Sequence, residues 1–206
     1  KKAPRFKLKK QKKGYIQMEN FQDIEFDILF YLQSLHNPIL DKIMVNITSL
    51  GNLGAIWFII SIILMIIKKY RRYGVLLFVT LALTGCLGSF VIKPLIARSR
   101  PCDVFKEVDI LIRHPGGFSF PSGHTYLSFA AATVICFMNK KLGILAFIFA
   151  VVMGFSRMYL FVHFPSDVVA GALLGVVVAL FNISIYKAFQ NKGKHIRKKR
   201  ARRLKR

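Results

Sequence analysis

One carboxylate and one histidine stand out by their spacing. After Asp109 the chain has a single acidic residue, Asp167, which lies four positions after His163 at the start of an apolar run. On a helix or a tight helical corner such residues share a face, so the carboxylate can accept a hydrogen bond from one imidazole nitrogen. The other nitrogen is then free to act as base or nucleophile. The structural alternative is a helix-capping aspartate beside a histidine at the lipid head groups.

Three cations accompany this pair. Lys93 and Arg100 stand seven apart where one apolar run ends, and Arg157 precedes His163 by six residues. Each one alone is explained more simply as a long side chain that reaches from the end of a span to water. Together with two histidines they predict a site for an anion.

The tetrapeptide Pro121-Ser122-Gly123-His124 opens another apolar run. Gly123 permits close backbone approach, Ser122 can cap a helix, and the free amides of the first turn point at any anion outside. His124 is then placed at the same anion as His163.

These groups together predict phosphoryl transfer. One histidine attacks, a second protonates the departing oxygen, and cations with helix-end amides stabilise charge on the equatorial oxygens. The sequence offers no carboxylate cluster for magnesium. Cys86, Cys102 and Cys136 form no CxxC pair, so we expect no disulfide, zinc site or other cofactor.

The elements that must position these residues are membrane spans. The 206 residues are 54% hydrophobic with a mean hydropathy of +0.44, which indicates a bilayer environment. Five uncharged runs are candidate spans: Ile43–Ile67, Tyr73–Ile92, Pro115–Asn139, Leu142–Ser156 and Val168–Tyr186.

The first run contains the turn signal Gly51-Asn52-Leu53-Gly54, so we divide it into a helix over about Ile24–Leu50 and another over Leu53–Ile67. The expected fold is therefore an all-α bundle of six transmembrane helices. Asn37-Pro38 should kink the first helix, whose first half suits the membrane surface.

Charge sets the expected orientation. Of 32 basic residues, eight lie in residues 1–13 and eleven in Lys187–Arg206. These ends and the short loops Lys68–Arg72 and Lys140–Lys141 predict cytosolic termini that contact anionic lipid, with the site on the non-cytosolic side of the cytoplasmic membrane. Nucleic-acid binding by the C-terminal run is the alternative, which we do not expect. The predicted division is a basic segment 1–19, a membrane domain 20–187 and a basic cytosolic tail 188–206. A start at Met18 would make residues 1–17 upstream or non-native sequence.

Three motifs that contain these residues resemble those of a known family. Lys93-Pro94-Leu95-Ile96-Ala97-Arg98-Ser99-Arg100-Pro101, then Pro121–His124, then Ser156-Arg157 with His163 and Asp167 are similar to the three-part signature of the type 2 phosphatidic acid phosphatases. The soluble relatives of that family include vanadium haloperoxidases. The resemblance implies a haloperoxidase-like helical core and a metal-independent membrane lipid phosphatase.

By position, the resemblance implies that His163 is the nucleophile that forms a phosphohistidine, Asp167 its orienting partner and His124 the acid. It implies that the phosphate oxygens are held by a further set of residues: Lys93, Arg100, Arg157, Ser122 and Gly123. Arg98 and Arg113 lie outside the signature and either meet a second phosphate or are solvated, and we favour solvation.

The sequence indicates the substrate less clearly than the type of reaction. The short chain and the segment Leu35–Asp41 resemble bacterial members that convert undecaprenyl pyrophosphate to undecaprenyl phosphate. Some of those have Asp where this chain has Gly123, so phosphatidylglycerophosphate and phosphatidate remain alternatives. A lipid-binding or translocating protein without activity is the non-enzymatic alternative.

Overall fold

The structure is a computed structural model that describes residues 19–203, and all regular structure in that range is helical. The elements in chain order are α1 (Glu19–Ser34), α2 (Pro38–Leu50), the 3-10 turn η1 (Asn52–Gly54), α3 (Ala55–Ile66), α4 (Arg71–Cys86), the π-helical stretch η2 (Leu87–Ile92), α5 (Lys93–Ile96), α6 (Pro101–Val104), α7 (Gly123–Met138), α8 (Lys140–Tyr159) and α9 (Pro165–Arg203). The predicted all-α class is confirmed.

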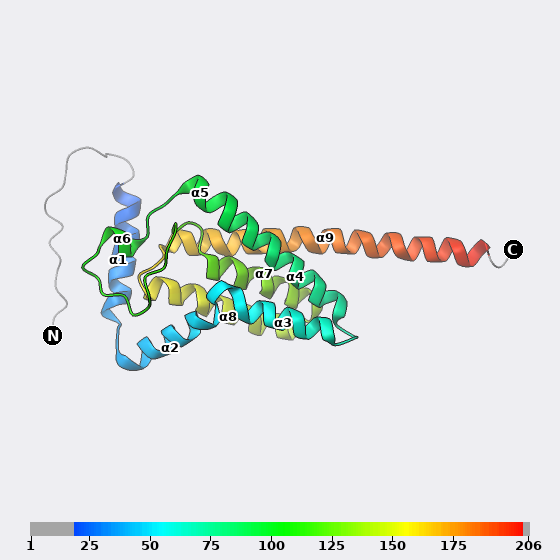
Figure 1. Cartoon of the computed structure of the whole chain (residues 1–206), viewed down its shortest axis with the longest axis horizontal. Helices are drawn as coiled ribbons and strands as arrows, with labels where there is room; N and C mark the ends of the chain where they lie inside the picture. The colour runs from blue at the N-terminus through cyan, green and yellow to red at the C-terminus, as the bar shows by residue number, and fades with distance from the viewer. Residues whose placement is uncertain (1–18, 204–206) are drawn as a thin grey trace.

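Helix α7 is the centre of the bundle and packs against α4, α8 and α9 (Figure 1). Its apolar and alanine side chains form the main core with residues of α3 and α4. Gly171 and Gly175 on α9 let the two backbones approach closely, because an added Cβ would lie 2.8 Å from the carbonyl oxygen of Ser122 and 2.3 Å from that of Tyr126. The start of α9 is thereby held against the start of α7, which joins the segments bearing His124 and His163.

Three helical segments are long and apolar enough to cross a membrane: Arg71–Val104, Lys140–Tyr159 and Pro165–Lys192. A fourth crossing is obtained if α2 and the η1–α3 helix, bent by 45° at Gly51, count as one broken span. Helix α7 is apolar but has only 16 residues. Among the described residues the predicted count of six spans is therefore not confirmed.

The first predicted span is two separate helices. The chain breaks between Ser34 and Pro38, where Asn37 caps α2 by accepting a hydrogen bond from Leu40 N at 3.0 Å. Helix α1 does not run with the bundle but lies across one end of it (Figure 1). Its apolar side packs Phe26 and Leu29 against the α8–α9 corner. The position of this half at the membrane surface stays a prediction.

The bundle has two chemically different ends. At one end, called the site end, α5 stops, α7 starts, and the chain turns from α8 into α9 beneath α1. The opposite end carries the short connections after α3 and α7, and the basic residues 68–72 and 140–141 lie in or directly after these connections. Helix α9 continues past Tyr186 to Arg203 and projects beyond the other helices at that opposite end (Figure 1).

Candidate active site

His163 lies in the tight corner between α8 and α9. Helix α8 ends at Tyr159, Phe161 turns the chain with a left-handed φ of 58°, and Pro165 starts α9. A positive φ is costly for a bulky residue, so buried packing must hold the corner in place. Phe161 is fully buried and His163 is 2% exposed. The imidazole is therefore held by the corner and does not move as a loop side chain would.

Both ring nitrogens of His163 have defined neighbours. Arg100 Nη1 lies 3.1 Å from Nε2, and Nδ1 lies 3.5 Å from Asp167 Oδ2 and 3.4 Å from the Ser119 hydroxyl. A guanidinium can only donate, so Nε2 presents its lone pair and the proton of the neutral ring is on Nδ1. This is the tautomer that a nucleophile with an acidic orienting partner requires. Sequence reasoning missed Ser119, which carries no motif spacing.

The charge state of the ring follows from its surroundings. The pKa of His163 is lowered to about 3, mainly by burial, although the hydrogen bond to Asp167 raises it. The nearby guanidinium groups of Arg157 and Arg100 lower the pKa further. The imidazole is therefore neutral over the physiological pH range, with Nε2 available to attack.

Asp167 is held on several sides. Its Oδ2 accepts hydrogen bonds from Phe164 N at 2.8 Å and from the Ser119 hydroxyl, and its Oδ1 accepts one from Arg98 Nη1 at 2.7 Å. The same carboxylate thus accepts a backbone hydrogen bond at the start of α9 and faces Nδ1 of His163. Arg98 also pairs with Glu25 of α1, so the expectation that Arg98 is solvated was wrong. The reason is that α1 folds over the site end and brings an acid to it.

Arg100 and Lys93 share an acceptor. Arg100 is 4% exposed and donates to the carbonyl oxygens of Gly116, Gly117 and Phe118 at 3.2, 3.0 and 3.1 Å. Lys93 Nζ donates to the same Phe118 carbonyl at 2.6 Å. The segment between α5 and α7 therefore wraps around the Arg100 guanidinium and brings the lysine to its side.

Arg157 is joined to Arg100 through the corner backbone. The Val162 N–H donates to the Arg157 carbonyl at 3.2 Å, and the Val162 carbonyl accepts from Arg100 Nη1 at 3.0 Å. Arg157 is 3% exposed, and its Nη1 donates to the Thr48 hydroxyl of α2. Its Nε is one of two buried side-chain nitrogens among the described residues without a partner. A buried donor of this kind is costly unless a ligand oxygen satisfies it.

His124 lies at the first turn of α7 and faces the α2–η1 break. Its Nε2 is 3.2 Å from the Thr48 carbonyl oxygen and 3.3 Å from Asn52 Oδ1. Carbonyl oxygens only accept, so Nε2 carries a proton. An added Cβ on Gly51 would come within 2.6 Å of the imidazole, which shows how closely the break packs on the ring. Sequence reasoning missed Thr48 and Asn52, whose only signal was the turn signal itself.

The other residues of the predicted helix start behave differently. Ser122 occupies the N-cap position of α7 but makes no side-chain cap, because its buried hydroxyl accepts a hydrogen bond from Thr125 at 2.9 Å. Its backbone N–H donates to the Asp167 carbonyl at 3.0 Å. Gly123 has room beside it, since an added Cβ would meet nothing closer than the Tyr126 hydroxyl at 3.6 Å.

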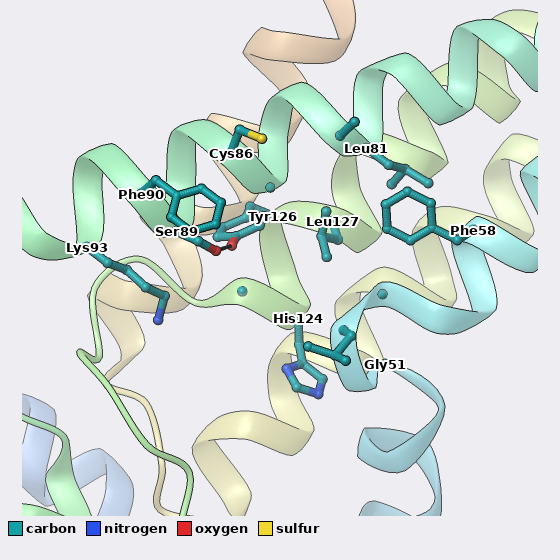
Figure 2. Close-up of a pocket in the computed structure, with 15 residues that line it drawn as sticks. Gly51, Phe58, Leu81, Cys86, Ser89, Phe90, Lys93, His124, Tyr126 and Leu127 are labelled. Carbon is teal, nitrogen blue, oxygen red and sulfur yellow. Dashed lines mark hydrogen bonds between the residues drawn. The ribbon is translucent and has the colours of Figure 1, made fainter.

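Two cavities meet at His124. The first, called the apolar groove, has a volume of about 430 Å³ and runs between α3, α4, η2 and α7. Figure 2 shows Lys93 and His124 on one side of its lining, and Phe58 and Leu81 on the side away from Lys93. The second, called the polar pocket, has a volume of about 460 Å³ and is lined by His124, Arg157, Thr48, Asn52, Arg113 and six further residues.

One group of side chains at the site end has metal-ligand chemistry. The ligand atoms of Cys102, Asp103 and His114 lie within 4.8 Å of one another. His114 Nε2 is 2.9 Å from Asp103 Oδ1, and Asp103 Oδ2 accepts from Arg100 N at 3.1 Å. These contacts form an ion pair that ties α6 to the chain preceding α7. Neither Cys102 nor Asp103 lines either cavity.

The fold and this geometry define a helical membrane protein whose buried cations and two imidazoles gather at one end of the bundle. The PAP2 superfamily matches residues 73–191, more than half of the chain, and the protein belongs to this family. It is therefore a multi-pass membrane protein and a lipid phosphatase, a hydrolase of phosphoric esters. The resemblance seen in the sequence is confirmed.

Three relatives illustrate the match. The undecaprenyl-diphosphatase of Sulfolobus acidocaldarius is 32% identical over 80% of each chain, and the lipid A 4'-phosphatase of Bacteroides thetaiotaomicron is 29% identical over 77% of this chain and 75% of that one. The crystal structure of a transmembrane phosphatidylglycerolphosphate phosphatase from Bacillus subtilis superposes with a TM-score of 0.69 at 28% identity, covering 86% of this chain and 89% of that one.

Proposed function

We propose that this phosphatase removes the terminal phosphate of a lipid through a phosphohistidine at His163, without a metal, and that its substrate is undecaprenyl pyrophosphate. One observation carries the mechanism: the Nε2 lone pair of His163 lies 3.1 Å from Arg100 Nη1 while Nδ1 faces Asp167. An oxyanion on phosphorus attached to Nε2 would lie beside a buried guanidinium, where charge stabilisation is strong.

The first step forms a bond between Nε2 and phosphorus and breaks the bond from phosphorus to the leaving oxygen. The bonding pair stays on that oxygen, which takes a proton from the protonated form of His124. Arg100, Arg157 and Lys93 neutralise the charge on the three equatorial oxygens. The Arg157 Nε–H without a protein partner supports its assignment to one of these oxygens.

The second step regenerates the enzyme. His124, now neutral, accepts a proton from water, whose oxygen attacks phosphorus as the bond to Nε2 breaks. Inorganic phosphate leaves and His163 returns to its neutral tautomer. Asp167 stabilises the charged imidazole while phosphorus is attached, because Nδ1 keeps its proton towards the carboxylate. Ser122 and Gly123 contribute to phosphate binding through the start of α7.

The lipid tail is proposed to lie in the apolar groove. Apolar side chains dominate its lining, and it adjoins His124 and Lys93. The relatives named above act on an isoprenoid diphosphate, on lipid A and on phosphatidylglycerolphosphate. Phosphatidylglycerophosphate and phosphatidate are therefore the alternative substrates for this chain, and a lipid A phosphate joins them.

The membrane placement follows the charge pattern. The connections bearing residues 68–72 and 140–141 lie at the end opposite His163, and the basic part of α9 extends from that end. We place that end in the cytosol and the site on the non-cytosolic side of the cytoplasmic membrane. The prediction that the N-terminus is cytosolic falls on residues 1–18, outside the described part. The prediction of a separate basic tail from residue 188 also stays a proposal.

The test uses purified protein in detergent with EDTA and a panel of undecaprenyl pyrophosphate, phosphatidylglycerophosphate and phosphatidate. We expect phosphate release, fastest from the first lipid, and its loss in His163→Ala. Lys106→Ala is the control, because that exposed side chain lies in the segment before α7 but lines neither cavity. Activity that persists in His163→Ala refutes the mechanism, and a different preferred lipid refutes only the substrate.

A further inference from the structure

The polar pocket has the composition of an anion site. Arg157, His124 and Arg113 line it, and none of its lining residues is acidic. Nε2 of His124 lies at this pocket, because the two residues that it contacts, Thr48 and Asn52, both line it. The pocket is therefore continuous with the place where the leaving oxygen must lie if His124 protonates it.

Arg113 is the cation on this pocket that the hydrolytic steps do not use. Its side chain is exposed, and no hydrogen bond or ion pair joins it to any other residue in the described range. Arg98, the other basic residue outside the signature, is fully occupied by Glu25 and Asp167. Of the two, only Arg113 retains all its donors for a ligand.

The chain around Arg113 is fixed to the site. The adjacent His114 pairs with Asp103 at 2.9 Å, and Asp103 in turn accepts from the backbone N–H of Arg100 at 3.1 Å. Gly116, Gly117 and Phe118 then hold the Arg100 guanidinium. The segment that carries Arg113 is therefore bonded to Arg100 in two places, at its backbone N–H through Asp103 and at its guanidinium. The backbone at Arg113 thus has a defined position relative to the phosphate being transferred.

We propose that Arg113 and the polar pocket form a subsite for the second phosphate of a lipid diphosphate. The inference rests on the proposed function and adds the residue that recognises a diphosphate: with the terminal phosphate at His163 and the bridging oxygen at His124, the inner phosphate meets Arg113. The apolar groove shares His124 with this pocket, so the hydrocarbon can occupy the groove while the inner phosphate occupies the pocket. A lipid monophosphate has no group for Arg113 to bind.

The experiment compares two substrates with the same hydrocarbon, a polyprenyl diphosphate and the polyprenyl monophosphate, at equal mole fraction in detergent micelles. For Arg113→Ala we expect kcat/KM to fall at least tenfold on the diphosphate and less than about twofold on the monophosphate, since a charge-assisted hydrogen bond is lost only from the first. Lys106→Ala is the matched control, because it removes an exposed cation of the same segment that lines neither cavity. Arg113→Lys should restore part of the loss.

A second readout is independent of the leaving group. Inorganic pyrophosphate should inhibit the wild-type enzyme more strongly than orthophosphate, and Arg113→Ala should remove that difference. Equal losses on both lipids, or no loss on either, would overturn the subsite while leaving the phosphatase proposal standing. A wild-type enzyme that hydrolyses neither lipid would overturn both, and one that hydrolyses only the monophosphate would overturn the subsite and the diphosphate substrate while leaving the phosphohistidine mechanism standing.

Discussion

The two histidines of the site have contrasting surroundings. His163 is 2% exposed and is surrounded by Arg100, Asp167 and Ser119, which all lie within the region that matches the PAP2 superfamily. His124 is only partly buried, borders two cavities, and is contacted by Thr48 and Asn52. These last two precede residue 73, where the family match begins.

The different surroundings correspond to the two roles proposed for the rings: His163 attacks phosphorus, and His124 protonates the leaving group. The attacking ring is fixed in one tautomer by charged partners, as nucleophilic catalysis requires. The acid faces open space where leaving groups of different size must fit, and a helix break holds it in place. We therefore expect changes around His163 to abolish turnover on every substrate, and changes around His124 to have smaller effects that depend on the substrate.

The largest effect is expected for Asp167→Asn. The amide nearly preserves shape but no longer stabilises the charged imidazole, and it can donate to Nδ1 and force the wrong tautomer. We expect kcat to fall on the order of 10³-fold or more on all lipids of the panel, measured as phosphate release at saturating substrate. Asp109→Asn, which changes an exposed carboxylate outside both cavities, is the control. A change in KM alone would remove Asp167 from the chemistry.

The next largest effect is expected for Arg157→Ala. This change removes the buried guanidinium whose Nε has no protein partner, and the loss of transition-state stabilisation should be about 2 to 4 kcal/mol, seen mainly in kcat. Arg157→Lys keeps a charge but not the Nε donor, so it should recover only part of the rate. Arg72→Ala, at the opposite end of the bundle, should have no effect. If Arg157→Lys is fully active, the Nε assignment is wrong.

The pairing of His163 with Asp167 could be predicted from the sequence, whereas most of the residues that hold the two imidazole rings in place could not. Asp167 and His163 could be paired because helical spacing alone brings i and i+4 together. Arg98, by contrast, was expected in solvent, because its partner Glu25 is 73 residues away and meets it only when α1 folds across the site end. The contacts of Thr48 and Asn52 with His124 could not be predicted for the same reason, because they depend on how the helix break after α2 packs against α7.

The membrane topology shows a related limit. The run from residue 24 to 50 was treated as one helix kinked at Asn37-Pro38, because the turn signal after Leu50 was the only full break assigned there. Asn37 instead caps a new helix, and Gln33 and His36 bond to the Tyr159 carbonyl at 2.8 and 3.0 Å. Those contacts to the end of α8 hold α1 at the site end. Hydropathy records composition along the chain, and it cannot record a polar contact between residues that lie more than a hundred positions apart.

The pH dependence should distinguish the two rings. The nucleophile must be neutral, and burial lowers the pKa of His163 to about 3, so its protonation should reduce the rate only well below pH 6.5. Burial and the nearby Arg157 lower the pKa of His124 in the free enzyme, so its proton must be carried with the bound phosphate, and loss of that proton should reduce the rate on the alkaline side. The kcat/KM profile should therefore be bell-shaped, with its acid limb far below the ordinary histidine range. An acid limb near pH 6.5 would show that His163 is not desolvated in the active enzyme.

The smallest effect is expected for Asn52→Ala. Asn52 Oδ1 is 3.3 Å from His124 Nε2, but the Thr48 carbonyl at 3.2 Å remains after the change. The imidazole keeps one acceptor and loses part of its orientation, so kcat should fall by about threefold to tenfold, which corresponds to the loss of one ordinary hydrogen bond. Asn52→Asp retains an oxygen acceptor at the same position and should keep most of the activity. Asn46→Ala removes an exposed amide of α2 that lines neither cavity and should match the wild type. If Asn52→Ala and Asp167→Asn reduce kcat equally, the two histidines are held with the same strictness and the contrast drawn between them fails.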